Sequence, residues 1–241
     1  MNLLLYGAPG SGKGTQANML RTHFGIPHIA TGDMLRAEIQ AGTALGRQAQ
    51  PILAAGQYVS DEIMIGIVRH RLGKPDCAPG FIMDGFPRTV PQAEALDDLM
   101  HEFGKRFDRV IYLKVPVEEL LHRLSGRLVC PTCQRTYPPQ TTACAADGSA
   151  LVQREDDKPE AVRPRIEIYL DKTVPVLDHY RHERLVSEID GRGTIDEISS
   201  QVLAAVNGKH SSPLMGKSPA AGRAQGALPE KPGDGAKTKT A

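Results

Sequence analysis

The chain lacks an excess of charge of either sign. Its 241 residues include 29 Lys and Arg against 28 Asp and Glu, so the formal net charge is +1 at pH 7. A near-neutral protein has no global basic field that would attract nucleic acid or an anionic membrane surface. We therefore expect neither among its partners, and any ligand must be recognised at a local site.

Long apolar runs and cysteines are also scarce. The N-terminal apolar run ends at Tyr6 without a basic leader, and no later run reaches the roughly 20 residues that a membrane-spanning helix needs. Four cysteines are too few for a disulfide scaffold in a chain of this length, and three of them lie in one short stretch. The sequence therefore predicts a cytoplasmic protein with a cysteine-bound metal.

A glycine-rich turn follows the first apolar run. Residues 2–6 have the length of a strand, residues 7–15 contain four glycines and Lys13, and a helical pattern comes next. Glycines let a backbone curl around a phosphate with its N–H groups inward, and the helix adds its positive dipole end. The pattern predicts a P-loop in which Lys13 reaches the β- and γ-phosphates. Because Gly14 follows the lysine, Thr15 is the hydroxyl expected to face magnesium.

Short apolar runs alternate with helical patterns along the rest of the chain. The runs lie at 27–30, 81–83, 110–113 and 185–186, and stretches such as 93–103 and 117–124 have helical periodicity. This alternation favours an α/β fold, with a central parallel β-sheet flanked by helices. The P-loop is then expected at the carboxyl edge of the sheet, where such sheets bind ligands.

Three segments depart from this alternation. We expect small mobile subdomains at about 31–60 and 125–160, where turn residues interrupt the pattern. The segment 207–241 is mostly Gly, Pro, Ala, Ser and Lys, with almost no large apolar residue. Such a composition cannot offset the entropy of ordering, so it predicts a disordered tail.

Charged residues follow the third apolar run. Asp84 comes directly after it and is expected to hold magnesium through water, with helix capping as the alternative role. Because a guanidinium binds two phosphate oxygens at once, arginines after strand ends and glycine turns predict a site for several phosphates. These arginines are Arg36, Arg88, Arg123, Arg127, Arg154 and Arg165.

The clustered cysteines have the spacing of zinc ligands. Cys130 and Cys133 are separated by two residues, and Cys144 and Asp147 repeat that spacing with a carboxylate last. Two such turns can close a tetrahedral structural site, which would order a segment without a core of its own. The alternative is that Cys144 is an unpaired buried thiol and Asp147 belongs to a plain turn.

Three motifs together resemble the adenylate kinase family of nucleoside monophosphate kinases, in its long-lid, zinc-binding form. They lie at 7–16, at 31–36, and at 84–88 with Gln92. The resemblance covers about residues 1–206. It implies a P-loop kinase fold with an AMP-binding helical insertion near 30–59 and a zinc-bearing lid near 122–159.

The resemblance also implies which residues contact each ligand. For ATP they are Gly10, Ser11, Gly12, Lys13, Gly14, Thr15, Arg123, Arg127, Thr136, Tyr137 and the backbone of Gly193. For AMP they are Thr31, Arg36, Gln57, Tyr58, Val59, Gly85, Phe86, Pro87, Arg88, Gln92, Arg154 and Arg165. The catalytic set is Lys13, Asp84, Arg88, Arg123, Arg154 and Arg165. A cis bond is implied before Pro87. Pro164 would interrupt the helix that carries Arg165, which leaves the position of Arg165 open.

The expected reaction is reversible phosphoryl transfer from magnesium-bound ATP to AMP, giving two ADP, by a monomer. An AMP phosphate oxygen is already a nucleophile, so no general base is required. One alternative is a kinase for another nucleoside monophosphate, although Thr31 and Gln92 favour adenine. The other is a zinc-ribbon nucleic-acid-binding protein with a vestigial P-loop. The net charge and the lack of aromatics among basic residues at 130–147 argue against it.

Overall fold

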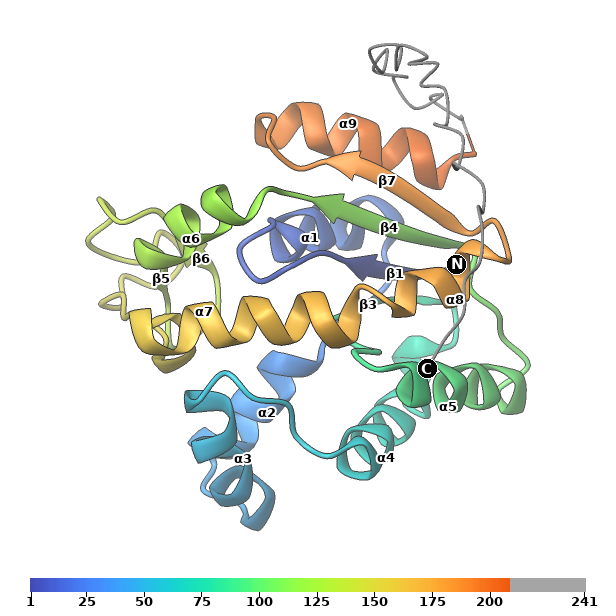
Figure 1. Cartoon of the computed structure of the whole chain (residues 1–241), viewed down its shortest axis with the longest axis horizontal. Helices are drawn as coiled ribbons and strands as arrows, with labels where there is room; N and C mark the ends of the chain where they lie inside the picture. The colour runs from blue at the N-terminus through green and yellow to red at the C-terminus, as the bar shows by residue number, and fades with distance from the viewer. Residues whose placement is uncertain (209–241) are drawn as a thin grey trace, which may run out of the picture. The chain divides into compact units, whose positions relative to one another are not determined.

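A parallel β-sheet of five strands forms the centre of the protein, which the computed structural model describes over residues 1–208 (Figure 1). In spatial order the strands are β2 (His28–Ala30), β3 (Phe81–Asp84), β1 (Asn2–Tyr6), β4 (Arg109–Lys114) and β7 (Val186–Asp190). Each apolar run of the sequence contributes to one strand, so the predicted parallel α/β fold is confirmed. Residues 209–241, which make up most of the predicted disordered tail, lie outside the described residues.

The register of the sheet determines which residues lie side by side at its carboxyl edge. Leu5 near the end of β1 is the parallel partner of Asp84, and Ala30 of β2 is the partner of Asp84 on the other side. The loops that follow these three strands therefore start next to one another. This is the edge at which open α/β sheets bind their ligands.

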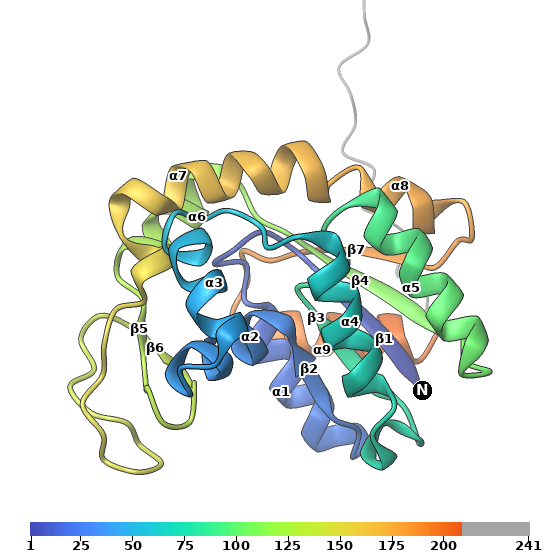
Figure 2. The same ribbon diagram turned by 90° about the horizontal axis from the view of Figure 1, so that it is seen from below.

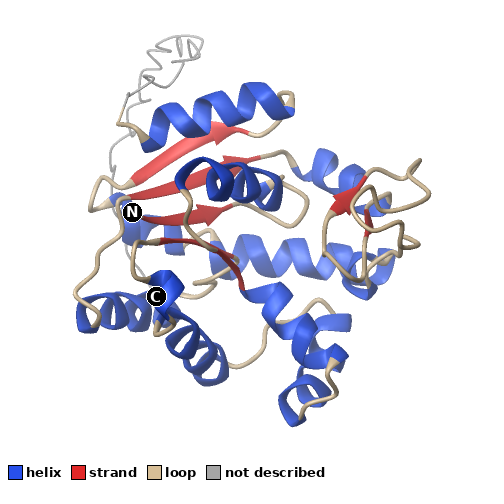
Figure 3. Ribbon diagram, turned by 180° about the vertical axis from the view of Figure 1, so that it is seen from behind, coloured by secondary structure: helices blue, strands red, loops and turns tan. Residues whose placement is uncertain are grey.

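Helices cover both faces of the sheet (Figure 3). On the face of Leu3 and Leu5 these are α1 (Lys13–Phe24) and α9 (Ile195–Val206). On the face of Leu4 and Tyr6 they are α4 (Asp61–Leu72), α5 (Val90–Glu102) and α8 (Val176–Arg181). All five residues of β1 are buried, as expected for a strand covered on both sides. Within residues 1–208, no helix is both long and apolar enough to cross a membrane.

Two insertions interrupt the strand and helix alternation (Figure 2). The first consists of α2 (Thr31–Gln40) and α3 (Ala44–Ala54), which follow β2, and a short 3₁₀ turn (Pro75–Cys77) comes later, before β3. The second lies between α6 (Val117–Ser125) and α7 (Pro159–Ile168). It contains the antiparallel strands β5 (Leu128–Val129) and β6 (Thr136–Tyr137) and the 3₁₀ turn Glu155–Asp157.

Pro164 lies inside α7 without ending it. A proline there cannot donate to the carbonyl four residues earlier, which belongs to Glu160. Glu160 is an exposed residue, and the helix continues past Pro164 through Arg165 to Ile168. Beyond Ile168 the chain passes through a π-helical turn, Tyr169–Thr173, into α8.

Candidate functional site

A cavity of about 1630 Å³ lies at the carboxyl edge of the sheet. It is lined by the P-loop, by α2, by the turn after β3, by α7 and by the small sheet of the second insertion. Segments from five separate parts of the sequence thus share one space.

The P-loop connects β1 to α1 and curls around the ammonium group of Lys13. Lys13 Nζ donates to the carbonyl oxygens of Gly7 at 2.8 Å and Ala8 at 3.1 Å. Gly12 caps α1 with a φ of 94°, a left-handed conformation that glycine adopts without strain. The predicted strand, glycine-rich loop and helix follow one another in that order, and Gly10 to Thr15 all line the cavity.

Lys13 carries an unusually low pKa for a lysine. Burial lowers this pKa to about 8, the neighbouring carboxylate of Asp84 opposes the shift, and the charges of Arg88, Arg165 and Arg127 add to it. Burial thus disfavours the charged form of Lys13 by more than the Asp84 carboxylate favours it. A bound anion such as a phosphate would supply further negative charge.

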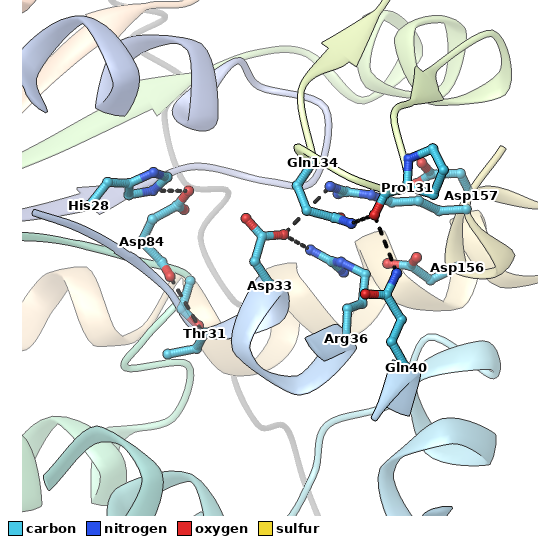
Figure 4. Close-up of polar contacts among 12 residues, drawn as sticks. His28, Thr31, Asp33, Arg36, Gln40, Asp84, Pro131, Gln134, Asp156 and Asp157 are labelled. Atoms are coloured by element: carbon cyan, nitrogen blue, oxygen red, sulfur yellow. Dashed lines mark hydrogen bonds and ion pairs between the residues drawn. The ribbon is translucent and has the colours of Figure 1, made fainter. Parts of the chain in front are cut away.

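Asp84 ends β3 beside Lys13 and contacts His28 of β2. The His28 Nε2 atom lies 3.2 Å from Asp84 Oδ2. Figure 4 shows the two side chains in contact. Burial opposes ionisation of Asp84, but the His28 hydrogen bond and the Lys13 charge outweigh it and hold the pKa below its usual value. Thr89, and not Asp84, caps the next helix. An ionised carboxylate next to a P-loop is a donor of the kind that magnesium prefers.

The turn after β3 brings Arg88 back over its own backbone. Arg88 Nε donates to the Gly85 carbonyl at 2.7 Å, and Thr31 Oγ1 donates to the same oxygen at 2.9 Å. Gly85 has a φ of 77°, and a Cβ there would lie 3.2 Å from a guanidinium nitrogen of Arg88. Only glycine fits this turn without displacing Arg88. The expected cis bond between Phe86 and Pro87 is present.

The six arginines expected from the sequence all line the cavity. Arg165 is among them, so Pro164 does not displace it. Four are held by buried or half-buried carboxylates: Arg127 by Asp157, Arg165 by Asp156 and Asp157, and Arg36 and Arg154 by Asp33. Figure 4 shows Asp33 reaching Arg36. Arg123 is held elsewhere, by Glu119 at 2.7 Å and the Gly191 carbonyl at 3.0 Å.

Two of these arginines have buried N–H groups that no described residue accepts. Within residues 1–208, the Nε atoms of Arg36 and Arg154 are buried without a hydrogen-bond partner. Burial, together with the nearby charges of Arg36 and Arg127, lowers the pKa of Arg154 to about 10. Buried donors without acceptors are costly, and an anion bound between the two arginines would satisfy both.

Most of the other expected ligand contacts also line the cavity. They are Gln57, Tyr58, Gly85, Phe86, Pro87, Thr136, Tyr137 and Gly193. Thr31, Val59 and Gln92 instead line a small adjoining cavity that shares Tyr58 and Arg88 with the large one. The Gln92 amide is engaged on both sides: it donates to Asp61 at 2.6 Å and accepts from the Arg88 backbone at 2.8 Å.

Sequence reasoning missed the carboxylates that hold the arginines, and it missed His28. Asp33 stands inside the motif at 31–36, and Asp156 and Asp157 follow Arg154 by two and three residues. Acidic residues interleaved with clustered arginines were therefore the available signal. The sequence does not show which arginine each carboxylate holds, because some of these pairs join segments that are far apart in the chain.

Replacing Asp157 with Asn is expected to lower the free energy of unfolding by about 3 kcal/mol, the scale for breaking a buried ion pair. The Asp157 side chain is fully buried, and its loss leaves Arg127 and Arg165 without a shared counter-charge. Urea denaturation measures the change. Glu155→Gln, which removes an exposed carboxylate from the same 3₁₀ turn, should leave stability unchanged. Equal stability of the two variants would contradict the expectation.

The cysteine cluster of the second insertion closes around one point. Cys130, Cys133, Cys144 and Asp147 each offer one ligand atom, and these atoms all lie within 4.8 Å of one another. The sulfur atoms of Cys133 and Cys144 are 3.5 Å apart. Four ligands bonded to one zinc ion at about 2.3 Å lie roughly 3.8 Å apart, so the cluster fits a tetrahedral site. Three thiolates favour zinc over magnesium or calcium.

A P-loop and an arginine-lined cavity at the carboxyl edge of a parallel sheet define a phosphate-transferring P-loop kinase. Comparison with known proteins agrees: a model of the adenylate kinase family matches residues 5–185. The chain therefore belongs to the adenylate kinase family.

Proteins named adenylate kinase are similar to this chain over nearly their whole length. The protein of Trichlorobacter lovleyi is 49% identical over 86% of this chain and 99% of its own. The protein of Exiguobacterium sibiricum is 48% identical over 87% of this chain and 100% of its own. That of Methanocella arvoryzae is 44% identical over 86% and 98%. The similarity thus extends through both insertions.

Proposed function

We propose that the chain transfers the terminal phosphoryl group of ATP to AMP, giving two ADP, and catalyses the reverse reaction. One observation carries the proposal: a single cavity is lined both by the P-loop lysine and by arginines whose buried Nε donors no described residue satisfies. Membership of the adenylate kinase family supports the same reaction.

The donor nucleotide is assigned to the P-loop side of the cavity. Gly10 to Thr15 would hold the phosphates of ATP with Lys13, and Arg123 and Arg127 would contact them from α6 and the loop beyond it. Thr136, Tyr137 and Gly193 would line the rest of the ATP site. Magnesium bound with ATP neutralises charge on the β- and γ-phosphates, and Asp84 and Thr15 would hold it from the protein side.

The acceptor is assigned to the side of α2 and the turn after β3. Arg36, Arg88 and Arg154 would hold the AMP phosphate, with Arg165 between the two nucleotides. Thr31, Gln57, Tyr58, Val59, Gly85, Phe86, Pro87 and Gln92 would surround the nucleoside. This assignment is supported by the small cavity between Thr31 and Gln92, which adjoins the Arg88 guanidinium.

Positioning and charge neutralisation are the chemistry that these residues supply. The acceptor oxygen is ionised at neutral pH, so the site needs no general base. Lys13, Arg88, Arg123, Arg154 and Arg165 would offset the charge that spreads over the transferring group. The second insertion would act as a lid that excludes water, because water in the closed site would hydrolyse ATP.

We propose zinc as the structural metal of that lid, held by Cys130, Cys133, Cys144 and Asp147. The short separations among these four side chains support it. We also propose a cytoplasmic monomer. The P-loop, Asp84 and the arginines of the cavity all come from one chain, and the described cysteines are free thiols, as a reducing compartment would keep them.

ATP binding is expected to weaken as the pH rises through about 8. The pKa of Lys13 in the nucleotide-free protein is about 8, so the ammonium loses its proton above that pH and with it the attraction for phosphate. Bound phosphates raise this pKa again, so kcat/KM for ATP should fall at a lower pH than kcat does. Steady-state profiles between pH 6 and about 10 measure both. Coincident profiles would contradict the assignment of Lys13.

A coupled assay for ADP formation tests the proposed function directly. The protein should convert ATP and AMP into ADP, with AMP strongly preferred over UMP, CMP and GMP. Preference for another nucleoside monophosphate would show that AMP is not the acceptor substrate. Absence of turnover with all four would overturn the proposal. Metal analysis of the same preparation tests the zinc assignment separately.

A further inference from the structure

Arg88 lies over the face of a tyrosine ring from another part of the chain. The guanidinium carbon of Arg88 is 4.8 Å from the centre of the Tyr58 ring. Tyr58 follows α3 in the first insertion, whereas Arg88 follows β3 of the central sheet. At this distance the electron-rich face of the ring attracts the cation.

The hydroxyl group of Tyr58 connects to Arg88 by a second route. Thr173 Oγ1 donates its one proton to the Arg88 carbonyl at 3.0 Å. The Tyr58 hydroxyl lies 2.9 Å from the same Oγ1, so it must be the donor in that contact. Thr173 is 4% exposed and closes the π-helical turn between α7 and α8, so this link is anchored in the core.

The remaining contacts of Arg88 leave its outer edge free. Nε donates to the Gly85 carbonyl and the backbone N–H donates to Gln92. Within residues 1–208, neither terminal nitrogen of the guanidinium donates a hydrogen bond. These two nitrogens form the edge that binds a phosphate in a fork.

The kind of partner that holds each arginine differs in a way that bears on phosphate binding. Arg127 and Arg165 are held by the carboxylate of Asp157, which uses their N–H groups. The face of an aromatic ring attracts a guanidinium without accepting from its N–H edge. Arg88 is therefore fixed in orientation while its donors stay free for a ligand.

We propose that Tyr58 is a positioning residue for Arg88 in AMP binding. Its ring holds the guanidinium plane, and its hydroxyl, through Thr173, holds the Arg88 backbone. The inference rests on the proposed function, because it takes the acceptor phosphate of AMP as the ligand of Arg88. It assigns to the Tyr58 side chain an effect on AMP that acts through Arg88.

The test compares Tyr58→Leu, which removes both the ring and the hydroxyl, with Tyr58→Phe, which keeps the ring. Calorimetry on the full chain should show the dissociation constant for AMP rising about fivefold in the leucine variant, within the range of a partly desolvated cation–π contact. The phenylalanine variant should show a smaller rise. The dissociation constant for ATP should not change in either, which a general loss of structure would not permit.

The same substitution in an Arg88→Ala background decides whether Tyr58 acts through Arg88. If it does, Tyr58→Leu causes no further weakening of AMP binding once Arg88 is gone. An equal effect in both backgrounds, or wild-type affinity in Tyr58→Leu alone, would overturn the inference. Thermal unfolding of each variant establishes that it is folded; should Tyr58→Leu fail to fold, Tyr58→Phe and Thr173→Val carry the comparison with Arg88→Ala.

The two proposals fail in different ways. If Arg88→Ala binds AMP and turns over like the wild type, the assignment of Arg88 in the proposed function is wrong. If Arg88→Ala is impaired and the Tyr58 variants are not, the proposed function stands and only the inference about Tyr58 falls.

Discussion

Replacing Lys13 with Met is expected to lower turnover by about 10²- to 10³-fold, the scale seen when one preorganised donor is removed from a charged transition state. Lys13 Nζ is fixed by the Gly7 and Ala8 carbonyls at the centre of the P-loop. Methionine fills similar space but carries no charge. The fold should survive, because the substitution also removes a cation that burial disfavours. The coupled ADP assay and thermal unfolding measure the two effects.

A surface lysine gives the matched control for this variant. Lys74 is exposed and lies outside the cavity, so Lys74→Met should keep wild-type turnover. Turnover of Lys13→Met within a few-fold of the wild type would show that the P-loop lysine is not part of the reaction. If the variant lost turnover because it unfolded, Lys13 would be required for stability and its part in the reaction would not be supported.

Replacing Cys144 with Ser is expected to weaken zinc binding by at least about 100-fold, since even residues that only support a metal ligand cost up to that much. Three ligands remain in this variant, and the site opens to water. Asp147→Cys should retain or tighten binding, because it exchanges a hard ligand for a thiolate. Competition with a chelator measures affinity, and hydrogen exchange in the second insertion should show that this segment loosens before the central sheet does.

Cys77 provides the control for the zinc experiment. It is buried beside Arg71 and does not belong to the four-residue cluster, so Cys77→Ser should keep one zinc ion per chain. Wild-type protein purified without stoichiometric metal would rule the site out. So would full zinc content in a Cys130→Ser, Cys133→Ser double variant.

The central sheet could be predicted because its strands are short apolar runs with clear ends. The run before the P-loop is buried on both faces and stops at glycine, so strand and loop were readable from adjacent residues. The strands β5 and β6 have only two residues each and carry no such pattern. The π-helical turn at Tyr169–Thr173 likewise has no signature in the sequence that we identified.

The residues that face the ligands could be predicted where they belong to a sequence motif. The residues that hold them in place could not. The sequence left open whether Pro164 displaces Arg165, whereas the structure continues α7 through Pro164 and places Arg165 at the cavity. The pairing of Tyr58 with Thr173 joins residues 115 positions apart. Nothing local to either residue indicates the other.

The backbone pairing of β1 with β3 fixes the distance between the P-loop and Asp84. Because Leu5 pairs with Asp84, hydrogen bonds of two strands set how far the acidic group stands from the P-loop. Changing side chains within β1 alters stability but not this spacing. One residue inserted into β3 would slide the carboxylate by about 3.3 Å and turn it to the opposite face of the sheet. The side chains of these strands can therefore change at a cost in stability alone, whereas a change in strand length would displace a reactive group.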